Sequence, residues 1–491
     1  MMSPQGEPNE RLVEGPSDLT AVVAFGAELT SYPRLWRWLS IADMAHVRGL
    51  AGAGAITPEI ERELLRELLS THSLEMPPLD PGKGDLYSNR FAHLRTTIGP
   101  VVDHIHTGRA RREATTIAWH LETRSRIETA IASVARLVGA LLSVAASHST
   151  TLMSDFTYLQ HAHPTTLGHY LLGFAYPLTR DLRRLTAALE NMNRSPAGSG
   201  SVNGSRIPID RVKLAEDLEF DGLLTHNRDA MWAPDVALDP MWATMSAMIT
   251  VDRLSEELQL WATAEFGYFE PADPHSRTSV IMPQKKNPYG LAMIRGHARD
   301  QVGHLISVIT TNLTPTGQPD NRVRAYGEVP ASLERLEGAA GLLGEHLELG
   351  EFDTVAMAKS ARSDFTTATE ICDWMTFEHG VGNRDAHAVV GKAVRNAIER
   401  GGDSLTVEDI QEAAGELEVE LPSIEPGVLD SLQDPMTTLE HRNGLGSVTD
   451  VERMIQELAG QLDTLPSSRF ADFEQRYLDS IVRAIDERNA T

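Results

Sequence analysis

The chain has 491 residues, 41% of them hydrophobic and 23% charged, which is typical of a globular protein with a large core. Its formal net charge of -25 argues against nucleic acid and anionic membrane surfaces as partners, and it means that an anionic substrate needs locally clustered cations. Cys372 is the single cysteine, which excludes an internal disulfide and a cysteine-based zinc cage and fits a cytoplasmic location.

The chain begins with a segment, residues 1–19, that is rich in Pro, Gly and Glu and does not resemble a secretory signal. From there on, apolar residues recur at three- and four-residue spacing, which predicts an all-α fold built around long bundle helices. The longest apolar run, residues 127–146, contains Arg136 and is interpreted as a buried bundle helix and not as a membrane span. The predicted helices cover residues 60–69, 114–149, 167–192, 241–266, 290–313 and 331–349.

The first dense polar segment is His104–Glu113, where three arginines lie close to a glycine. In so acidic a chain such a cluster suits an anion, although a salt-bridged helix start would have the same composition.

The second segment is Thr157–Thr166, in which His161 and His163 are two residues apart. Histidines at this spacing do not share a helix face, and the sequence shows no third ligand in register, so we expect no metal here.

Two further segments are predicted to be connections. Ser195–Ser205 is rich in glycine and serine and is interpreted as a flexible linker, because no P-loop lysine follows that would complete a phosphate cradle. The acidic, proline-bearing segment 417–426 is interpreted as a surface connection.

The most informative segment is Ser276–Pro288, which lacks helical or strand periodicity and is therefore predicted to be a loop. Lysine offers a point charge and asparagine offers directed donors, a combination that suits a dicarboxylate. A serine among cations is a plausible proton acceptor, because positive neighbours favour its anionic form. The alternative is an ordinary solvated loop.

These segments together resemble the aspartase/fumarase superfamily over almost the whole chain, from about residue 25 to the end, and most closely the argininosuccinate lyases. Residues 276–288 resemble the GSSxMPxKxN loop in its MPQKKNP form, 104–113 resemble HTGRSRND, and 157–164 resemble THLQxAQP. Further segments resemble the family as well: 204–211 resemble GTSFPIDR, 227–230 resemble NSLDA with one residue fewer, 364–369 resemble GFATATD and 391–394 resemble VGKAV.

The resemblance implies three mainly helical domains and a homotetramer with a 20-helix core, in which each active site is shared between subunits. The domains would be residues 1–113 with the HTGRAR loop, 114–362 with the long bundle and the Ser279 loop, and 363–491 as a small helical domain.

The implied chemistry is removal of a proton next to a carboxylate, with loss of an amine or similar group, from a small anionic dicarboxylate and without a metal or other cofactor. Ser279 would be the base, and oxyanion-type donors would stabilise the intermediate. The other predicted substrate contacts are Lys285, Asn287, Thr157, Arg111, Arg112, Gln160, Met282 and His106.

Several positions depart from the family pattern. Tyr158 and Ala292 replace a histidine–glutamate pair, and Arg112 replaces an asparagine. Val280 stands for a second serine, Tyr32 aligns less securely with an aspartate, and residues 320–326 replace the YNKDxQ segment.

We therefore expect a cytoplasmic lyase that forms fumarate from an N-substituted succinate other than argininosuccinate. Arg112 favours an anionic leaving group, such as nitrite from a nitrosuccinate, and the alternative is that the phenol of Tyr158 donates a proton to the leaving group. The competing hypotheses are a cycloisomerase of the 3-carboxymuconate type and a catalytically silent, crystallin-like protein.

Overall fold

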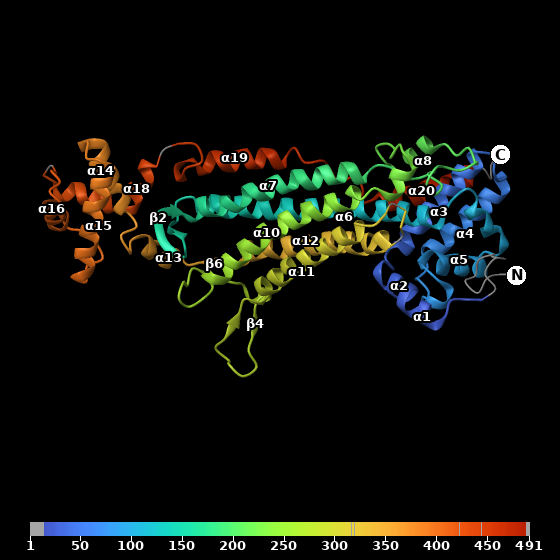
Figure 1. Cartoon of the computed structure of the whole chain (residues 1–491), viewed down its shortest axis with the longest axis horizontal. Helices are drawn as coiled ribbons and strands as arrows, with labels where there is room; N and C mark the ends of the chain where they lie inside the picture. The colour runs from blue at the N-terminus through green and yellow to red at the C-terminus, as the bar shows by residue number, and fades with distance from the viewer. Residues whose placement is uncertain (1–13, 316, 319, 422, 443, 488–491) are drawn as a thin grey trace.

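The computed structural model describes residues 14–315, 317–318, 320–421, 423–442 and 444–487. The molecule is elongated, with a group of helices at one end, a long helix bundle in the middle and a small helical cluster at the other end (Figure 1). Helices supply nearly all of the regular structure, so the predicted all-α fold is confirmed.

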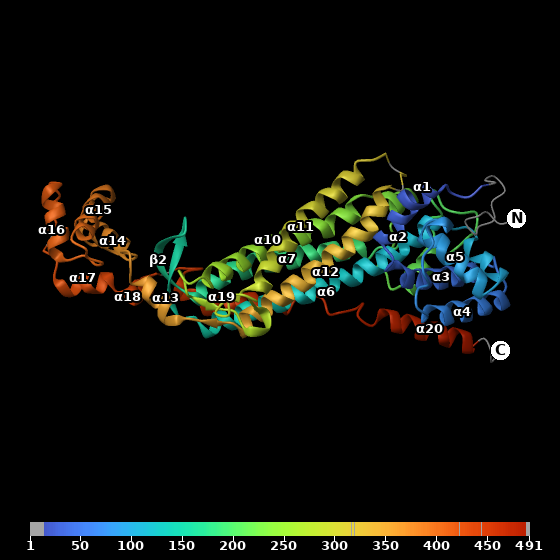
Figure 2. The ribbon, with the colours of Figure 1, turned by 90° about the horizontal axis from the view of Figure 1, so that it is seen from below.

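The middle of the molecule is a bundle of long helices that run along its length (Figure 2). Their amphipathic faces pack against each other, and the bundle places the loops that carry the predicted site residues at or near its ends. The bundle helices are α6 (Arg111–Ser147), α7 (Leu167–Met192), α10 (Asp235–Trp261), α11 (Tyr289–Asn312) and α12 (Asp320–Leu349).

Helix α6 is long and apolar enough to cross a membrane by length and composition alone. Of its most apolar window, 56% is buried inside the fold, where α6 packs against α3, α7, α12 and α19. The helix therefore behaves as the core helix of a bundle, which agrees with the interpretation of residues 127–146.

The N-terminal helices cover one end of the bundle. Thr57 caps α4 by accepting a hydrogen bond from the backbone N–H of Ile60, and Pro58 occupies the first helical position, where its missing N–H costs nothing. These helices are α1 (Asp18–Thr20), α2 (Ala27–Ser31), α3 (Leu35–Gly52), α4 (Pro58–His72) and α5 (Leu86–Thr97). Two short helices, α8 (Arg211–Asp217) and α9 (Asn227–Trp232), follow α7 and precede α10 in the sequence.

Among the described residues, the C-terminal part of the chain contributes to three hydrophobic clusters, the smallest of which joins Leu439 to Leu152 and Ala361. Helices α14 (Ala368–His379), α15 (Asn383–Glu399), α16 (Val407–Glu416) and α17 (Pro426–Gln433) enclose a separate small core. After α18 (Pro435–His441), helices α19 (Val451–Leu462) and α20 (Phe473–Glu487) return and contribute to the main core. The segment 363–491 thus does not form one unit, and the boundaries at residues 113 and 362 stay predictions.

In the described part of the chain the strands form three small antiparallel pairs, which the sequence did not predict. They are β1 (Leu152–Thr157) with β2 (Gln160–Thr166), β3 (Phe269–Glu270) with β6 (Glu351–Phe352), and β4 (Arg277–Thr278) with β5 (Lys286–Asn287). Helix α13 (Thr354–Ala361) follows β6 and packs against the β1–β2 hairpin. The loop predicted at Ser276–Pro288 is therefore the tip of a hairpin, which projects from the side of the bundle (Figure 1).

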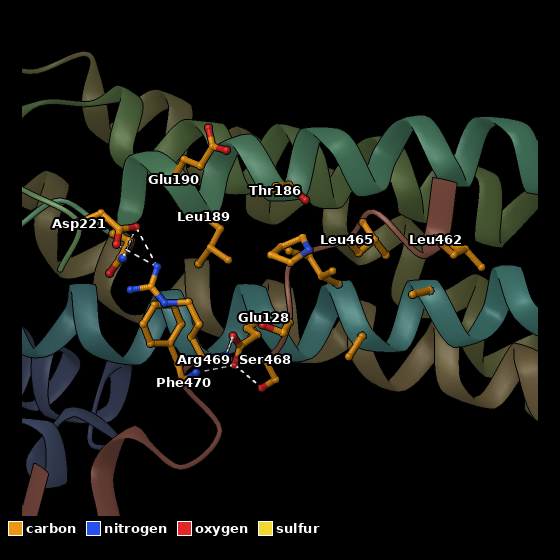
Figure 3. A pocket seen from close by; sticks show the side chains of 16 residues that line it. Glu128, Thr186, Leu189, Glu190, Asp221, Leu462, Leu465, Ser468, Arg469 and Phe470 are labelled. Carbon is orange, nitrogen blue, oxygen red and sulfur yellow. Dashed lines mark hydrogen bonds and ion pairs between the residues drawn. The ribbon is translucent and has the colours of Figure 1, made fainter. Parts of the chain in front are cut away.

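The connection between α19 and α20 is fastened to the bundle by two carboxylates (Figure 3). Glu128 accepts hydrogen bonds from Ser468 Oγ at 2.8 Å and from the backbone N–H of Phe470 at 2.9 Å. The two carboxylate oxygens of Asp221 accept hydrogen bonds from one guanidinium nitrogen of Arg469, at 2.9 and 3.1 Å. The connection borders a cavity of about 480 Å³ with a mainly apolar floor from α6 and α7, which lies apart from the predicted site residues.

Candidate active site

The arginine segment before α6 is organised around a buried aspartate. Asp43, on α3, accepts hydrogen bonds from Arg109 at 2.5 Å and from Arg90 at 3.1 Å, and none of the three side chains is more than 1% exposed. Arg109 also donates to the phenol oxygen of Tyr87 at 2.9 Å. Arg109 is thus structural, and it fixes the turn that delivers the next arginines to the start of α6.

Of the predicted contacts in this segment, Arg111 is the one most open to solvent. Its guanidinium donates to Ser88 Oγ at 2.9 Å and lies 3.4 Å from Asp85, and its side chain is 43% exposed. His106 packs edge-on against Tyr87 and Phe91. Burial and then the charge of Arg109 lower the pKa of His106 to about 4, so the ring is neutral at pH 7.

Arg112 lies beside a carboxylate that the sequence did not reveal as its partner. Its guanidinium is 3.5 Å from Glu28 and 6.0 Å from the ring centre of Tyr326. Glu28 also accepts a hydrogen bond from the phenol of Tyr32, whose pKa is raised well above its usual value by burial and by that carboxylate. The positive charge of Arg112 is therefore compensated within the chain.

The β1–β2 hairpin carries Thr157, Tyr158 and Gln160 at its tip. Thr157 pairs with Gln160, and the two residues between them, Tyr158 and Leu159, have φ values of 55° and 58°. A two-residue turn with positive φ at both positions matches the twist of a hairpin, but side chains other than glycine and asparagine rarely adopt it. Tyr158 is fully exposed at this tip.

The β4–β5 hairpin carries Ser279, Met282, Lys285 and Asn287. Ser279 Oγ accepts the backbone N–H of Met282 at 3.1 Å, and a donated hydrogen bond of this kind stabilises an anionic oxygen. Asn287 uses one amide hydrogen to bond the carbonyl of Arg277 at 2.7 Å, which closes the hairpin. Lys285 is exposed, whereas the neighbouring Lys286 is paired with Glu270 and Asp273 at 3.0 and 2.9 Å.

Within one chain these three groups of residues do not meet. The arginine group belongs to the end of the bundle beside α5, the β1–β2 hairpin lies near the opposite end, and the β4–β5 hairpin projects between them (Figure 1). The arginines that the sequence suggested as neighbours of Ser279 are therefore distant from it in the same chain.

The glycine-rich segment Ser195–Ser205 is not a flexible linker. Gly198 donates its backbone N–H to Glu113 at 2.6 Å, and the guanidinium of Arg211 bonds the carbonyl of Ala197 at 2.9 Å. A Cβ on Gly108 would lie 2.6 Å from Ser205 Oγ, so the segment packs closely against the turn before Arg109. The segment therefore helps to hold the turn that carries the arginine group in place.

Sequence reasoning missed Asp43 and Glu28. Asp43 could have been recognised from the sequence. It is an acidic residue within the apolar run Ile41–Ala45 of a helix, where an unpaired charge would be costly. Glu28 could not have been recognised from the sequence, because its partner Arg112 is 84 residues away and only the fold brings the two residues together.

Comparison with known proteins places the chain among lyases. Residues 21–303 match a family described as lyase, and residues 365–435 match the argininosuccinate lyase C-terminal family. The argininosuccinate lyase 2 of Shouchella clausii is 32% identical over 90% of this chain and 95% of its own.

Two solved structures share the fold. An EDDS lyase in complex with formate is 24% identical and superposes with a TM-score of 0.81 over 96% of this chain and 93% of its own. The 3-carboxy-cis,cis-muconate lactonizing enzyme of Pseudomonas putida is 18% identical, with a TM-score of 0.70 over 92% of this chain and 100% of its own.

Proposed function

Because the chain belongs to the aspartase/fumarase superfamily, close to the argininosuccinate lyases, we propose that it converts an N-substituted succinate into fumarate. It is a carbon–nitrogen lyase of the argininosuccinate lyase-like type. The observation that carries the proposal is the match to argininosuccinate lyases over 90% of the chain, together with the Ser279–Asn287 hairpin tip.

The proposed reaction begins at Ser279. Its oxygen removes the proton from the carbon next to a carboxylate, while Lys285 and the second amide hydrogen of Asn287 stabilise the resulting anionic carboxylate. The electron pair left on carbon forms the double bond as the carbon–nitrogen bond breaks. Arg111 and Thr157, from other copies of the chain, bind the substrate carboxylates.

A contact of Arg112 in the structure bears on the choice between the two hypotheses for the leaving group, the anionic one and the amine-type one. The argument for an anionic leaving group such as nitrite rested on the missing histidine–glutamate pair and was supported by the charge of Arg112, and Glu28 compensates that charge. We therefore propose an amine-type leaving group that takes its proton from the phenol of Tyr158, which is exposed at the hairpin tip.

The separation of the three groups supports a homotetramer with shared sites. Helices α10 and α11 pack against each other and present large apolar side chains to solvent in the single chain. Trp242, Ile249, Val302 and Ile306 are between 45% and 54% exposed, a pattern typical of a surface covered by another copy. We propose that this face is buried on assembly, which would bring Ser279 of one copy to Arg111 of another.

The test is an ultraviolet absorbance assay for fumarate with purified protein and a panel of N-substituted succinates, including argininosuccinate and nitrosuccinate. We expect fumarate from at least one alkylamine or amino-acid derivative, little from argininosuccinate, and none from the Ser279→Ala variant. If no N-substituted succinate yields fumarate above the level of that variant, the proposed function is wrong and a silent protein becomes the better description.

A further inference from the structure

Two histidines of the β1–β2 hairpin contact a segment that lies 203 to 206 residues later in the sequence. Nδ1 of His161 lies 2.6 Å from Asp364 Oδ2 and 3.3 Å from Ser363 Oγ. Nε2 of His163 lies 3.1 Å from Thr369 Oγ1. Alternate residues of a strand point to one face, so both imidazoles reach from β2 toward the segment 363–369.

Apolar packing holds the base of this hairpin, because Leu152 packs with Ala361 and Leu439 and Met153 is buried in the main core. A cavity of about 400 Å³ separates part of its inner face from α13 and from the start of β3. Its lining includes Phe156 and Leu159 from the hairpin and Tyr268, Ser360 and Ser363 from the body. Nearer the tip, the polar contacts of the two histidines add to the packing of the Phe156 ring against Phe266 and Tyr268.

Backbone conformation on both sides of these contacts also requires restraint. Tyr158 and Leu159 have φ values of 55° and 58°, and Asp364 and Phe365 have values of 54° and 57°. Left-handed conformations of such residues persist only where their surroundings hold them. The His161–Asp364 contact connects the hairpin that contains Tyr158 and Leu159 to the segment that contains Asp364 and Phe365, and so it links the two strained pairs.

We propose that His161, His163, Asp364 and Thr369 form a latch that positions the Thr157–Tyr158 tip for catalysis. The latch residues are positioning residues, because they act through the hairpin and not on the substrate. Figure 1 shows β2 beside α13, where the chain leaves the bundle for the small helical cluster, so the latch also couples the hairpin to that cluster. The catalytic part of this inference rests on the proposed function.

The imidazole of His161 can donate Nδ1–H to Asp364 whether the ring is neutral or protonated. Other charged groups at the latch are Glu265 and Lys359, which line the same cavity, and Glu370, which is near His163 and paired with Arg442. Asp364→Asn is the milder variant, because asparagine tolerates the left-handed backbone and keeps an accepting oxygen, so that only the negative charge is lost.

The first measurement is hydrogen–deuterium exchange of the full-length protein. Peptides covering residues 152–166 are compared in wild type, Asp364→Asn, His161→Ala and the control Asp403→Asn, an exposed loop aspartate between α15 and α16. We expect exchange of the hairpin to rise about tenfold in His161→Ala, the effect of losing one hydrogen bond to a charged group, to rise less in Asp364→Asn, and to stay unchanged in the control.

The second measurement is kinetic, with the succinate derivative that gives most fumarate. His161→Ala is expected to lower kcat about tenfold or more, and Asp364→Asn to lower it less, with little change in KM, because the tip is misplaced in the transition state. The double variant His161→Ala/Asp364→Asn should lose no more than His161→Ala alone.

The outcomes separate the latch from the proposed function. Unchanged exchange of residues 152–166 in both variants overturns the latch, and raised exchange with unchanged kcat overturns its role in positioning. If wild type forms no fumarate from any derivative, the proposed function fails and the exchange result alone decides whether the latch exists.

Discussion

At the scale of single residues, the hydrogen bond from the backbone of Met282 to Ser279 Oγ is the clearest preparation for base catalysis, because it stabilises the anionic oxygen. Ser279→Ala should lower kcat on the order of 10²-fold or more, the usual contribution of a general base. The matched control is Ser276→Ala in the same segment, whose hydroxyl bonds the carbonyl of Ala272 at 2.9 Å and should be dispensable for turnover. Turnover by the Ser279 variant within a few-fold of wild type would remove the serine from the mechanism.

Tyr158 is predicted to matter only where the leaving group needs a proton. Tyr158→Phe should lower kcat about 10²-fold for alkylamine derivatives and leave a nitro derivative nearly unaffected. The measurement is kcat across a series of succinates with leaving groups of increasing basicity. An equal effect on every member of the series would show that the phenol positions the substrate and does not act as the acid.

The stability of the protein is expected to depend on pH through the carboxyl group of Glu113. Burial raises its pKa from 4.5 to about 7 in the folded protein. Since the folded state holds this proton more tightly than the unfolded state, wild type should lose stability relative to Glu113→Gln as pH rises from about 4.5 to about 7.

The expected difference between wild type and Glu113→Gln is on the order of 3 kcal/mol above pH 7 and close to zero below pH 4.5. Thermal unfolding of both proteins across this range measures it, with the exposed Glu63→Gln on α4 as control. A pH-independent difference between the two proteins would mean that the pKa of Glu113 is the same in the folded and unfolded states.

At the scale of elements, the periodicity of apolar residues predicted the long helices well. The prediction of 167–192 coincides with α7, and that of 114–149 differs from α6 by a few residues. Amphipathic periodicity is a local property, so it is visible without the fold.

The β1–β2 hairpin could not be predicted in the same way. Its turn is formed by Tyr158 and Leu159 and not by the asparagine–glycine pairs that mark hairpins in a sequence, and its second strand contains Pro164 and two histidines. The tip of the Ser279 loop was recognised from its residue types, whereas the Arg112–Glu28 pair depends on tertiary structure.

The element that presents Arg111 should depend on Asp43. Asp43→Asn leaves Arg90 and Arg109 buried without their carboxylate, which typically costs about 3–5 kcal/mol. The variant should therefore unfold at a clearly lower temperature than wild type. Asp103→Asn, which removes the surface partner of Arg95, should change stability by about 1 kcal/mol or less. Equal melting temperatures of the two variants would contradict the structural role of Asp43.

At the scale of the whole molecule, the predicted site residues occupy three separate regions of one chain. Sequence reasoning could name them because each region has a compact motif, but their separation along the bundle became visible only in the fold. The family match makes the chemical class firm, and the tetramer, the shared site and the cytoplasmic location stay predictions. A shared site would explain why Ser279 and Arg111 lie on different parts of the same chain.

The most direct test of a shared site is complementation between two inactive variants. Arg111→Ala and Ser279→Ala proteins are mixed, dissociated and reassembled, and fumarate formation is compared with each variant treated alone. If the two residues of a site come from different chains, hybrid assemblies contain some sites with both residues intact, and activity should return to a substantial fraction of wild type. Verified subunit exchange without any return of activity would contradict the shared site and with it the proposed assembly.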